Sequence, residues 1–405
     1  AVSQPYWLRT PPNGGLSAVS DRADLGQPEN RPTAVARFEL SIAGERVTFT
    51  LPVAHRWTDP VQGERWRLLE IAPPGTMRFE SAFQLFADAS ARAVSVTVQA
   101  QRAGLTGELR LDVPEGWQVS PATVPVALDL AGREQVVTFR ITPGSTSGIA
   151  RAVLRTADGR EWAQGMQRID YPHVPVQSLF PAAELKLVRT ALTLRAPRIG
   201  YLAGSGDPIA EALRQMGAQV TELSDEDVAT GDLSRFETIV TGVRAYNTRP
   251  RLRVLQPRLL DWVARGGRLV VQYVTTADGP VEGLGPFPFR VSRDRVTRED
   301  AAITFRLPTH PLVREPNVLT DQDFTGWVQE RGLYFANPWD ARYDAVLGSH
   351  DPGEPSREGG LLYAAHGRGA FVYCGYALFR QIPAGVEGGW RLLANLASGA
   401  REPRP

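Results

Sequence analysis

Hydrophobic and polar residues alternate along the first part of the chain, which is the pattern of half-buried β-strands. Two such runs, 36–42 and 47–51, flank a short connection that contains Gly44. The apolar positions that share one face are Phe38, Leu40, Ile42, Val47, Phe49 and Leu51. A period of two on both sides of a glycine-containing connection predicts a β-hairpin. Residues 1–70 are therefore expected to form a β-rich N-terminal module.

The alternation continues through residues 71–172. Short runs over 94–98, 109–113 and 137–141 are separated by turn sequences that are rich in proline and glycine. Regularly spaced short strands of alternating polarity are typical of an antiparallel β-sandwich of the immunoglobulin type. A linker over 173–196 follows, in which residues 182–194 are expected to form a short helix.

The pattern changes after this linker. A short apolar run at 199–204 precedes a stretch whose apolar residues recur at helical spacing, and Gly217 ends that stretch. Strand-like runs at 238–242, 269–274 and 370–376 follow, with helical patterns between them and at 386–397. Alternating strands and helices predict a doubly wound α/β domain over 197–405. The expected fold class is therefore multidomain, with β modules followed by an α/β domain.

Composition narrows the range of functions. The chain has 45 basic and 44 acidic residues among its 405, and so lacks the basic excess that a nucleic-acid-binding protein needs. Its one cysteine, Cys374, excludes an internal disulfide and lies in an apolar run that predicts a buried strand. No apolar run is long enough to span a bilayer. The chain starts at Ala1 without a methionine, which we interpret as the end left by signal-peptide removal or by excision from a longer polypeptide, and a periplasmic or extracellular location is expected.

Recognised catalytic motifs are missing from the sequence. None of the five histidines has the spacing of a metal site, so neither a metal nor a cofactor is expected, and the chain is predicted not to be an enzyme. The turn Gly204-Ser205-Gly206 fits neither a serine nucleophile elbow nor a completed dinucleotide-binding motif. We interpret it as a tight turn in which Asp207 caps the next helix.

Two polar segments are candidate ligand-binding regions. Open α/β sheets place ligands at the carboxyl ends of their strands, where the loop 241–249 is predicted to lie. The second segment, 323–340, combines aromatic and charged residues that suit sugar recognition or a protein-binding hot spot. The ten candidate residues are Arg244, Tyr246, Asn247, Arg249, Trp327, Gln329, Arg331, Trp339, Asp340 and Arg380. The alternatives are a solvated loop with local ion pairs, a tryptophan buried under a long loop, and a hydrolase that uses the carboxylates of 323–340.

Several longer runs resemble a known family. They are 241–249, 326–335, 350–354 and 379–385, together with 4–9 and 56–65. These runs are similar to the carboxy-terminal region of large bacterial PIG-L/LmbE-family deacetylases. The resemblance implies immunoglobulin-like modules followed by a domain similar to class I glutamine amidotransferases or ThuA-like proteins. The zinc motif of that family's catalytic domain does not occur in this sequence, so no catalytic residue is carried over. The turn at which amidotransferases place their cysteine corresponds to Val243-Arg244-Ala245, which offers no nucleophile.

The expected function is that of a non-catalytic, exported binding or scaffold protein. It would act as an accessory subunit that contacts a protein partner or the outer face of a membrane complex. The alternative is a carbohydrate-binding portion of an N-acetyl-sugar deacetylase whose zinc domain is missing.

Overall fold

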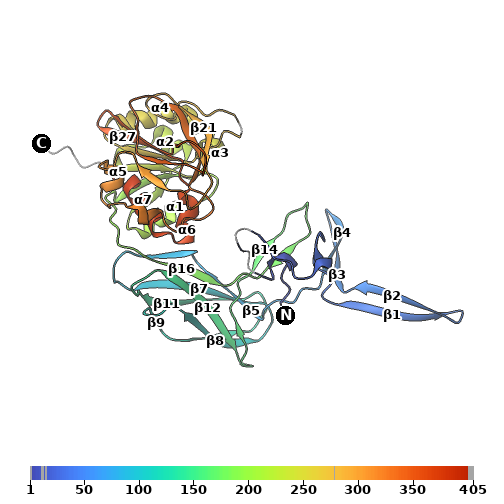
Figure 1. Cartoon of the computed structure of the whole chain (residues 1–405). Coiled ribbons are helices and arrows are strands. Elements are labelled where there is room, and N and C mark those ends of the chain that lie inside the picture. Colours follow the sequence, from blue (N-terminus) through green and yellow to red (C-terminus); the bar gives the residue numbers. More distant parts are fainter. Residues whose placement is uncertain (1, 11–12, 14–15, 278, 400–405) are drawn as a thin grey trace. The chain divides into compact units, whose positions relative to one another are not determined.

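The computed structural model describes residues 2–10, 13, 16–277 and 279–399. The chain forms two compact units. The first unit comprises residues up to Ser81, Arg92–Thr142 and Ile149–Leu185, and the second comprises Ala82–Ala91, Pro143–Gly148 and the chain from Lys186 onward. Figure 1 shows the course of the chain. The expected boundaries at 70 and 172 lie inside the first unit, and two short segments from the expected sandwich region belong to the second.

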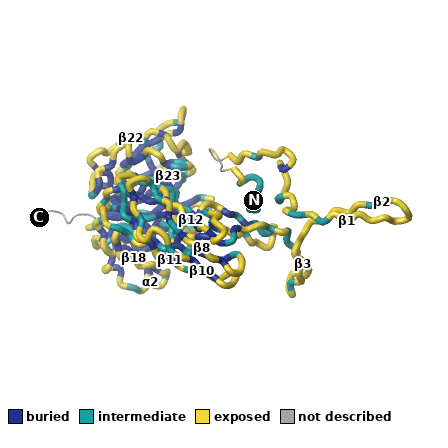
Figure 2. The backbone as a smooth tube through the Cα atoms, turned by 90° about the horizontal axis from the view of Figure 1, so that it is seen from below, coloured by how far each residue is buried: buried dark blue, intermediate teal, exposed yellow. Residues whose placement is uncertain are grey.

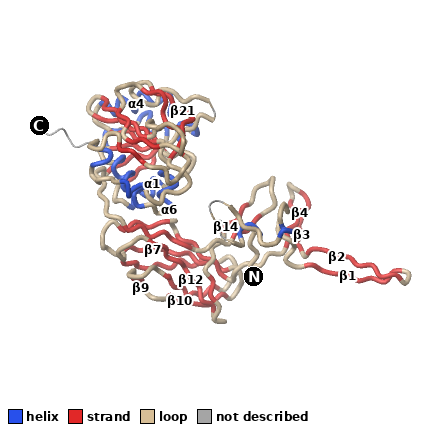
Figure 3. The backbone as a smooth tube through the Cα atoms, in the orientation of Figure 1, coloured by secondary structure: helices blue, strands red, loops and turns tan. Residues whose placement is uncertain are grey.

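Two β-hairpins dominate the N-terminal part of the first unit (Figure 3). The first joins β1 (Val35–Ile42) to β2 (Glu45–Pro52), with Phe38 opposite Phe49, and confirms the predicted hairpin. The second joins β3 (Ala54–Asp59) to β4 (Gly63–Leu68). Each hairpin is a two-stranded sheet that pairs with no other strand in the described part of the chain. Two single-turn 3-10 helices, η1 (Tyr6–Leu8) and η2 (Arg22–Asp24), precede them.

The rest of the first unit is β-rich, with sheets that pack like a sandwich. One four-stranded sheet has the order β5-β7-β11-β9, and β10, β8 and β12 pair in another. Alternate residues of β7, such as Val94, Val96 and Val98, are buried as the pattern predicted. The strands are β5 (Gly75–Phe79), β7 (Arg92–Ala100), β8 (Leu105–Asp112), β9 (Gln118–Ser120), β10 (Val124–Leu128), β11 (Glu134–Thr142), β12 (Gly148–Thr156), β13 (Glu161–Trp162), β14 (Gln167–Ile169) and β15 (Gln177–Leu179).

The segment predicted as a short helix at 182–194 instead contains strand β16 (Glu184–Arg189). Its residues from Lys186 onward pair in parallel with β6 (Phe83–Phe86) within the second unit. Alternate side chains of β16 are buried, including Leu185 and Leu187. The helix prediction was wrong because the pairing partner lies about a hundred residues earlier in the chain, beyond the reach of a local pattern.

A seven-stranded sheet forms the centre of the second unit, in the order β18-β17-β19-β20-β27-β26-β24. Its first five strands are parallel, and β26 and β24 continue it in antiparallel fashion. The parallel strands follow the sequence order 2-1-3-4-5, which is one of the common doubly wound orders. The strands are β17 (Arg198–Leu202), β18 (Gln219–Glu222), β19 (Thr238–Thr241), β20 (Arg268–Gln272), β24 (Asp344–Ala345), β26 (Leu361–His366) and β27 (Gly369–Cys374).

Apolar side chains cover both faces of this sheet. Val240 and Val270 belong to one buried cluster, whereas their neighbours Ile239 and Leu269 belong to another. The helices are α1 (Ile209–Gln215), α2 (Asp225–Thr230), α3 (Ala245–Thr248), α4 (Arg251–Ala264), α5 (Pro311–Arg314), α6 (Leu378–Ala384) and α7 (Glu387–Ala397), with 3-10 helices η3 (Leu233–Arg235) and η4 (Asp321–Phe324). The resemblance to glutamine amidotransferases stays a prediction, because proteins of many functions share such folds.

A long insertion between β20 and β27 carries the second candidate segment. It contains two small antiparallel pairs, β21 (Phe289–Val296) with β23 (Gly332–Trp339) and β22 (Ile303–Phe305) with β25 (Leu347–Ser349). Residues 323–340 therefore include a 3-10 helix, a loop and strand β23.

Candidate binding sites

The turns that follow β17 and β19 pack tightly against each other. This is the point where the strand order reverses, and where doubly wound sheets commonly bind ligands. A Cβ atom on Gly204 would lie 2.0 Å from the carbonyl oxygen of Val243, and one on Gly242 would lie 2.8 Å from the backbone nitrogen of Gly204. The backbone N–H of Ser205 also donates to the carbonyl of Val243 at 2.8 Å. The chain itself thus occupies the space between these two turns.

Asp207 holds the two turns together. Its carboxylate accepts hydrogen bonds from the Tyr201 hydroxyl at 2.6 Å and from the backbone N–H groups of Ile209 at 2.9 Å and Val243 at 2.7 Å. Burial, together with the Asp207 charge, raises the pKa of Tyr201 above its ordinary value. Asp207 therefore serves the start of α1 as expected, although the residue directly before the helix is Pro208, and it also holds the turn after β19.

Three of the candidates in the loop 241–249 hold the fold together. The buried hydroxyl of Tyr246 donates to Gln256. Asn247 exchanges hydrogen bonds with the backbone of Thr275, at 2.8 and 3.0 Å. Arg249 pairs with Asp225 and also donates to the carbonyl of Leu223 at 3.1 Å. These contacts give the three side chains structural roles.

Arg244 and Arg380 come together with aromatic residues at the carboxyl edge of the sheet. The backbone N–H of Arg244 donates to Tyr273 at 2.8 Å, and the Tyr273 ring contacts Phe379 at a centroid distance of 5.3 Å. Arg380 pairs with Glu330 at 2.9 Å. Burial raises the pKa of Tyr273. The charge of Glu330 also raises this pKa, whereas the charges of Arg380 and Arg244 lower it. Charged and aromatic groups therefore converge on the ends of β19, β20 and β27.

Three residues of the candidate segments and strand β23 have strained backbone conformations. Arg244, Gln329 and Tyr334 have φ angles of 59°, 68° and 58°, in the left-handed region that residues other than glycine seldom adopt. Tyr334 also contacts Tyr273, at a centroid distance of 5.4 Å. Such residues persist only where the surrounding structure enforces them, and they often mark functional sites.

Trp327 and Arg331 are buried rather than exposed. The Trp327 indole donates to the carbonyl of Asp323 at 3.0 Å, and the Arg331 guanidinium lies 5.4 Å from the Trp327 ring centroid. Arg331 donates to the carbonyls of Ala301 and Phe324. Gln329 is exposed, and its backbone N–H donates to Glu299 at 2.6 Å. The buried pair thus follows the alternative of a tryptophan packed under a long loop.

Trp339 and Asp340 line a surface pocket with a volume of ≈ 610 Å³. Its other walls come from Pro338 and from the segment 282–290, which ends in β21 and contributes Phe287 and Phe289. Asp340 accepts two hydrogen bonds from Arg342, which together with a backbone hydrogen bond lower its pKa to about 2. A carboxyl group with this pKa stays ionised near neutral pH, so it can accept hydrogen bonds but is a poor general acid.

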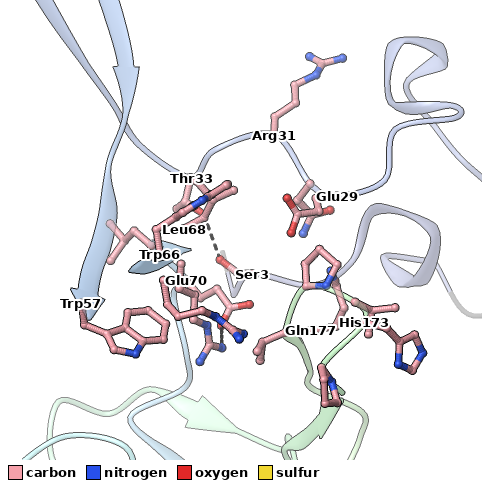
Figure 4. Close-up of a pocket in the computed structure, with 18 residues that line it drawn as sticks. Ser3, Glu29, Arg31, Thr33, Trp57, Trp66, Leu68, Glu70, His173 and Gln177 are labelled. Carbon is pink, nitrogen blue, oxygen red and sulfur yellow. Dashed lines mark hydrogen bonds and ion pairs between the residues drawn. The ribbon is translucent and has the colours of Figure 1, made fainter. Parts of the chain in front are cut away.

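A pocket of ≈ 380 Å³ lies in the first unit (Figure 4). The second hairpin contributes Trp57 and Trp66, and the segment 172–177 supplies further walls. Arg67 contacts Glu70 and donates to Ser178 at 2.7 Å, which connects the hairpin to β15. No pattern in the sequence indicates this pocket, because its walls lie about a hundred residues apart in the chain. The local signal was the presence of two tryptophans, Trp57 and Trp66, within one hairpin.

Most residues of the first hairpin are exposed, including the apolar ones (Figure 2). Phe38 and Phe49 remain 49% and 48% exposed, and Ile42 and Leu51 are each 56% exposed. Because Phe38 pairs with Phe49 and Leu40 with Val47, these residues form one continuous surface. The alternation predicted that these side chains share a face, but it could not show that the chain leaves that face uncovered.

Two further observations concern the described residues as a whole. Among the described residues, no group of three or more His, Cys, Asp or Glu side chains is placed to hold a metal ion. In the same part of the chain, no helix is long and apolar enough to cross a membrane.

Comparisons with known proteins return only distant structural likenesses. No protein family model and no curated protein matches the chain. A cold-adapted β-galactosidase from Rahnella sp. R3 is 12% identical, with a TM-score of 0.30, over 48% of this chain and 31% of the enzyme. A Salmonella alpha-2-macroglobulin mutant is 14% identical, with a TM-score of 0.21, over 38% of this chain and 10% of that protein. The chain spans a third or less of either protein, and TM-scores this low carry no argument about function.

Proposed function

We propose that this chain is a non-catalytic binding or scaffold protein that docks onto a protein partner through the apolar face of the β1–β2 hairpin. It would work in the periplasm or outside the cell, as an accessory subunit that contacts a protein or the outer face of a membrane complex. The observation that carries the proposal is the uncovered face that contains Phe38 and Phe49.

Leaving this apolar face in water costs free energy. An isolated two-stranded hairpin is marginally stable in water, and it gains stability when its apolar face is covered. Covering a half-exposed Phe, Leu or Ile contributes about 1 kcal/mol, so the whole face offers roughly 5 kcal/mol of hydrophobic stabilisation to a bound complex. Contiguous exposed apolar patches on soluble proteins mark interaction sites.

The second hairpin supports a protein partner. Trp57 and Trp66 are exposed, and Arg56 lies opposite Trp66 across the strands. Tryptophan and arginine are the residues most enriched in the energetic centres of protein interfaces. The backbone N–H of Leu69 donates to the carbonyl of Val53, so the two hairpins are joined directly.

The experiment compares two double variants in the native organism. Phe38→Ser with Phe49→Ser removes the apolar face, whereas Thr48→Ser with Thr50→Ser changes the opposite face of the same hairpin. Cross-linking mass spectrometry and gel filtration of native extracts should show a stoichiometric protein complex for the wild type and for the threonine variant, but not for the phenylalanine variant. Cell fractionation tests the location. A wild-type chain that elutes free of other proteins would refute the proposal.

Carbohydrate binding is the second candidate, and the pocket beside Trp339 and Asp340 favours it. An aromatic face next to an ionised carboxylate suits the apolar face and the hydroxyl groups of a sugar ring. Titration with N-acetylated oligosaccharides, followed by calorimetry, should give saturable heat that Trp339→Ala abolishes and Trp66→Ala preserves. Absence of heat at millimolar sugar would remove this candidate.

A further inference from the structure

The outer edge of β1 presents a row of backbone groups that no strand in the described part of the chain pairs with. The N–H of Val53 donates to the carbonyl of Ala34 at 3.0 Å, and the register continues without a bulge from there. In an antiparallel pair the backbone groups of alternate residues point toward the partner strand. The even-numbered residues of β1 therefore bond to β2, and the odd-numbered residues from Val35 to Ser41 direct their N–H and C=O groups outward.

The side chains along this edge specify what a pairing strand must contain. The even-numbered residues of β1 form part of the apolar face, and the opposite face carries Arg37 and Glu39. An antiparallel partner strand should place an acidic residue opposite Arg37, an apolar residue opposite Phe38 and a basic residue opposite Glu39. Read along the partner in its own direction, this order is basic, apolar, acidic, which is the order of Arg37-Phe38-Glu39 itself.

We infer that two copies of this chain pair through their β1 edges, with the twofold axis at Phe38. In this register Arg37 of each copy lies opposite Glu39 of the other, and Ala36 lies opposite Leu40. The outward backbone groups of the odd-numbered residues form about eight hydrogen bonds between the copies. The two hairpins become a four-stranded sheet with a single apolar face.

Other antiparallel registers fit less well. An axis at Arg37 or at Glu39 places identical charges opposite each other, which destabilises a strand pair. If the axis lies between two residues, outward-pointing backbone groups of one copy meet inward-pointing groups of the other. The apolar side chains of one copy then lie on the same side of the sheet as the polar side chains of the other. Within one copy Arg37 and Glu39 form an exposed ion pair at 3.1 Å, so pairing exchanges this partner for one on the second copy.

Pairing at the edge leaves the apolar face free, so this inference does not depend on the proposed function. It also explains how a two-stranded hairpin reaches the size at which a sheet with one apolar face becomes stable, which is three or more strands. Charged residues on edge strands protect many proteins from aggregation. Here the charged residues Arg37 and Glu39 are placed so that they favour one register.

A cysteine experiment tests the position of the axis. Phe38→Cys places two thiols in a directly opposed, non-hydrogen-bonded pair with Cα atoms about 4.5 Å apart, within the range of a disulfide. Leu40→Cys places them about 13 Å apart, which is too far. Because the native Cys374 is buried, oxidation of the purified protein should give a disulfide-linked dimer for Phe38→Cys alone. Equal cross-linking of both variants, or of neither, would overturn the inference.

A charge-reversal experiment tests the pairing independently of any disulfide. In sedimentation equilibrium the wild type should dimerise reversibly in the micromolar range. Arg37→Glu and Glu39→Arg should each weaken the dimer by roughly tenfold, since each variant opposes like charges twice. The double variant should restore wild-type affinity. A chain that stays monomeric to about 0.5 mM, or single variants without effect, would refute the pairing and leave the edge to a different partner.

Discussion

The guanidinium of Arg67 donates a hydrogen bond to the hydroxyl of Ser178 at 2.7 Å, although 111 positions of the chain separate the two residues. Glu70 completes the contact, because it accepts from Ser178 at 2.8 Å and pairs with Arg67. The side chains of Arg67 and Glu70 are about a quarter exposed, so water screens the ion pair only partly. Arg67 and Glu70 line the pocket, and Glu70 is labelled in Figure 4.

Replacing Arg67 should loosen that wall without unfolding the unit. Arg67→Met removes the donor to Ser178 and to Glu70, at a local cost of about 1–2 kcal/mol. Hydrogen–deuterium exchange of residues 172–179 should therefore accelerate about tenfold or more. Arg65→Met is the matched control, because Arg65 lies on the same strand and bonds to Gln62 within the hairpin. Unchanged exchange in Arg67→Met would show that other contacts hold this segment.

Asp207 should be among the most sensitive polar residues of the second unit. Asp207→Ala leaves the Tyr201 hydroxyl and two backbone N–H groups without their acceptor. We expect a loss of about 2–4 kcal/mol in the free energy of unfolding, because each partly buried donor then loses its hydrogen bond. Guanidinium denaturation measures this free energy of unfolding. Glu226→Ala, which breaks only an exposed pair with Arg251 at 3.9 Å, should change stability by less than about 0.5 kcal/mol. Equal effects of the two variants would contradict this account.

His310 should make the second unit less stable in acid. Its Nδ1 atom accepts from the backbone N–H of Leu312 at 3.1 Å, which requires an unprotonated nitrogen. Burial lowers the pKa of His310 below its ordinary value of 6.5, Arg268 lowers it further, and Asp344 opposes the shift. The folded protein therefore binds this proton less readily than the unfolded chain, so stability is present above pH 6.5 and is lost as the pH falls through the folded pKa.

The pH dependence can be isolated with one substitution. Asn is a good helix cap that does not titrate, so His310→Asn should keep the contact to Leu312 and reduce the change in denaturation midpoint between about pH 7.5 and about pH 5. A variant whose midpoint falls as steeply as that of the wild type would assign the acid sensitivity to other groups.

Cys374 should not react in the native protein. Burial raises the pKa of its thiol from 9.0 to about 12, so almost no thiolate forms near neutral pH. Labelling with an aromatic disulfide reagent at about pH 8 should be at least 100-fold slower than in the denatured chain. A Thr50→Cys variant supplies an exposed thiol as the positive control. Rapid stoichiometric labelling of the wild type would mean that the β27 region opens readily.

The first hairpin and the central strands of the second unit could be predicted because their signals are local. Alternation fixes which residues of 36–42 and 47–51 share a face, and short apolar runs with glycine ends mark buried parallel strands. Strand β16 was mistaken for a helix because its identity depends on pairing with Phe83–Phe86. Local sequence does not encode such pairing partners.

Candidate site residues were harder to predict than strands, since residue type does not reveal burial. Trp327 and Arg331 combine an aromatic ring with a cation, as binding sites do, yet carbonyl groups within the fold satisfy both polar ends. Trp339 and Arg380 have the same residue types and remain accessible to solvent. The difference lies in which distant segments fold over each side chain, and this follows from the tertiary structure alone.

The contact between Gly204 and Val243 also limits how this sheet could acquire catalysis. Val243 is buried, so a reactive side chain introduced at that position would be enclosed by the protein and out of reach of a substrate. Both turns would have to separate before any reactant entered, and that separation breaks the hydrogen bond from the Val243 N–H to Asp207 and the one from the Ser205 N–H to the Val243 carbonyl. An engineer seeking an enzyme on this scaffold would therefore have to rebuild two loops together, whereas new binding specificity could be selected on the exposed hairpins without disturbing the sheet.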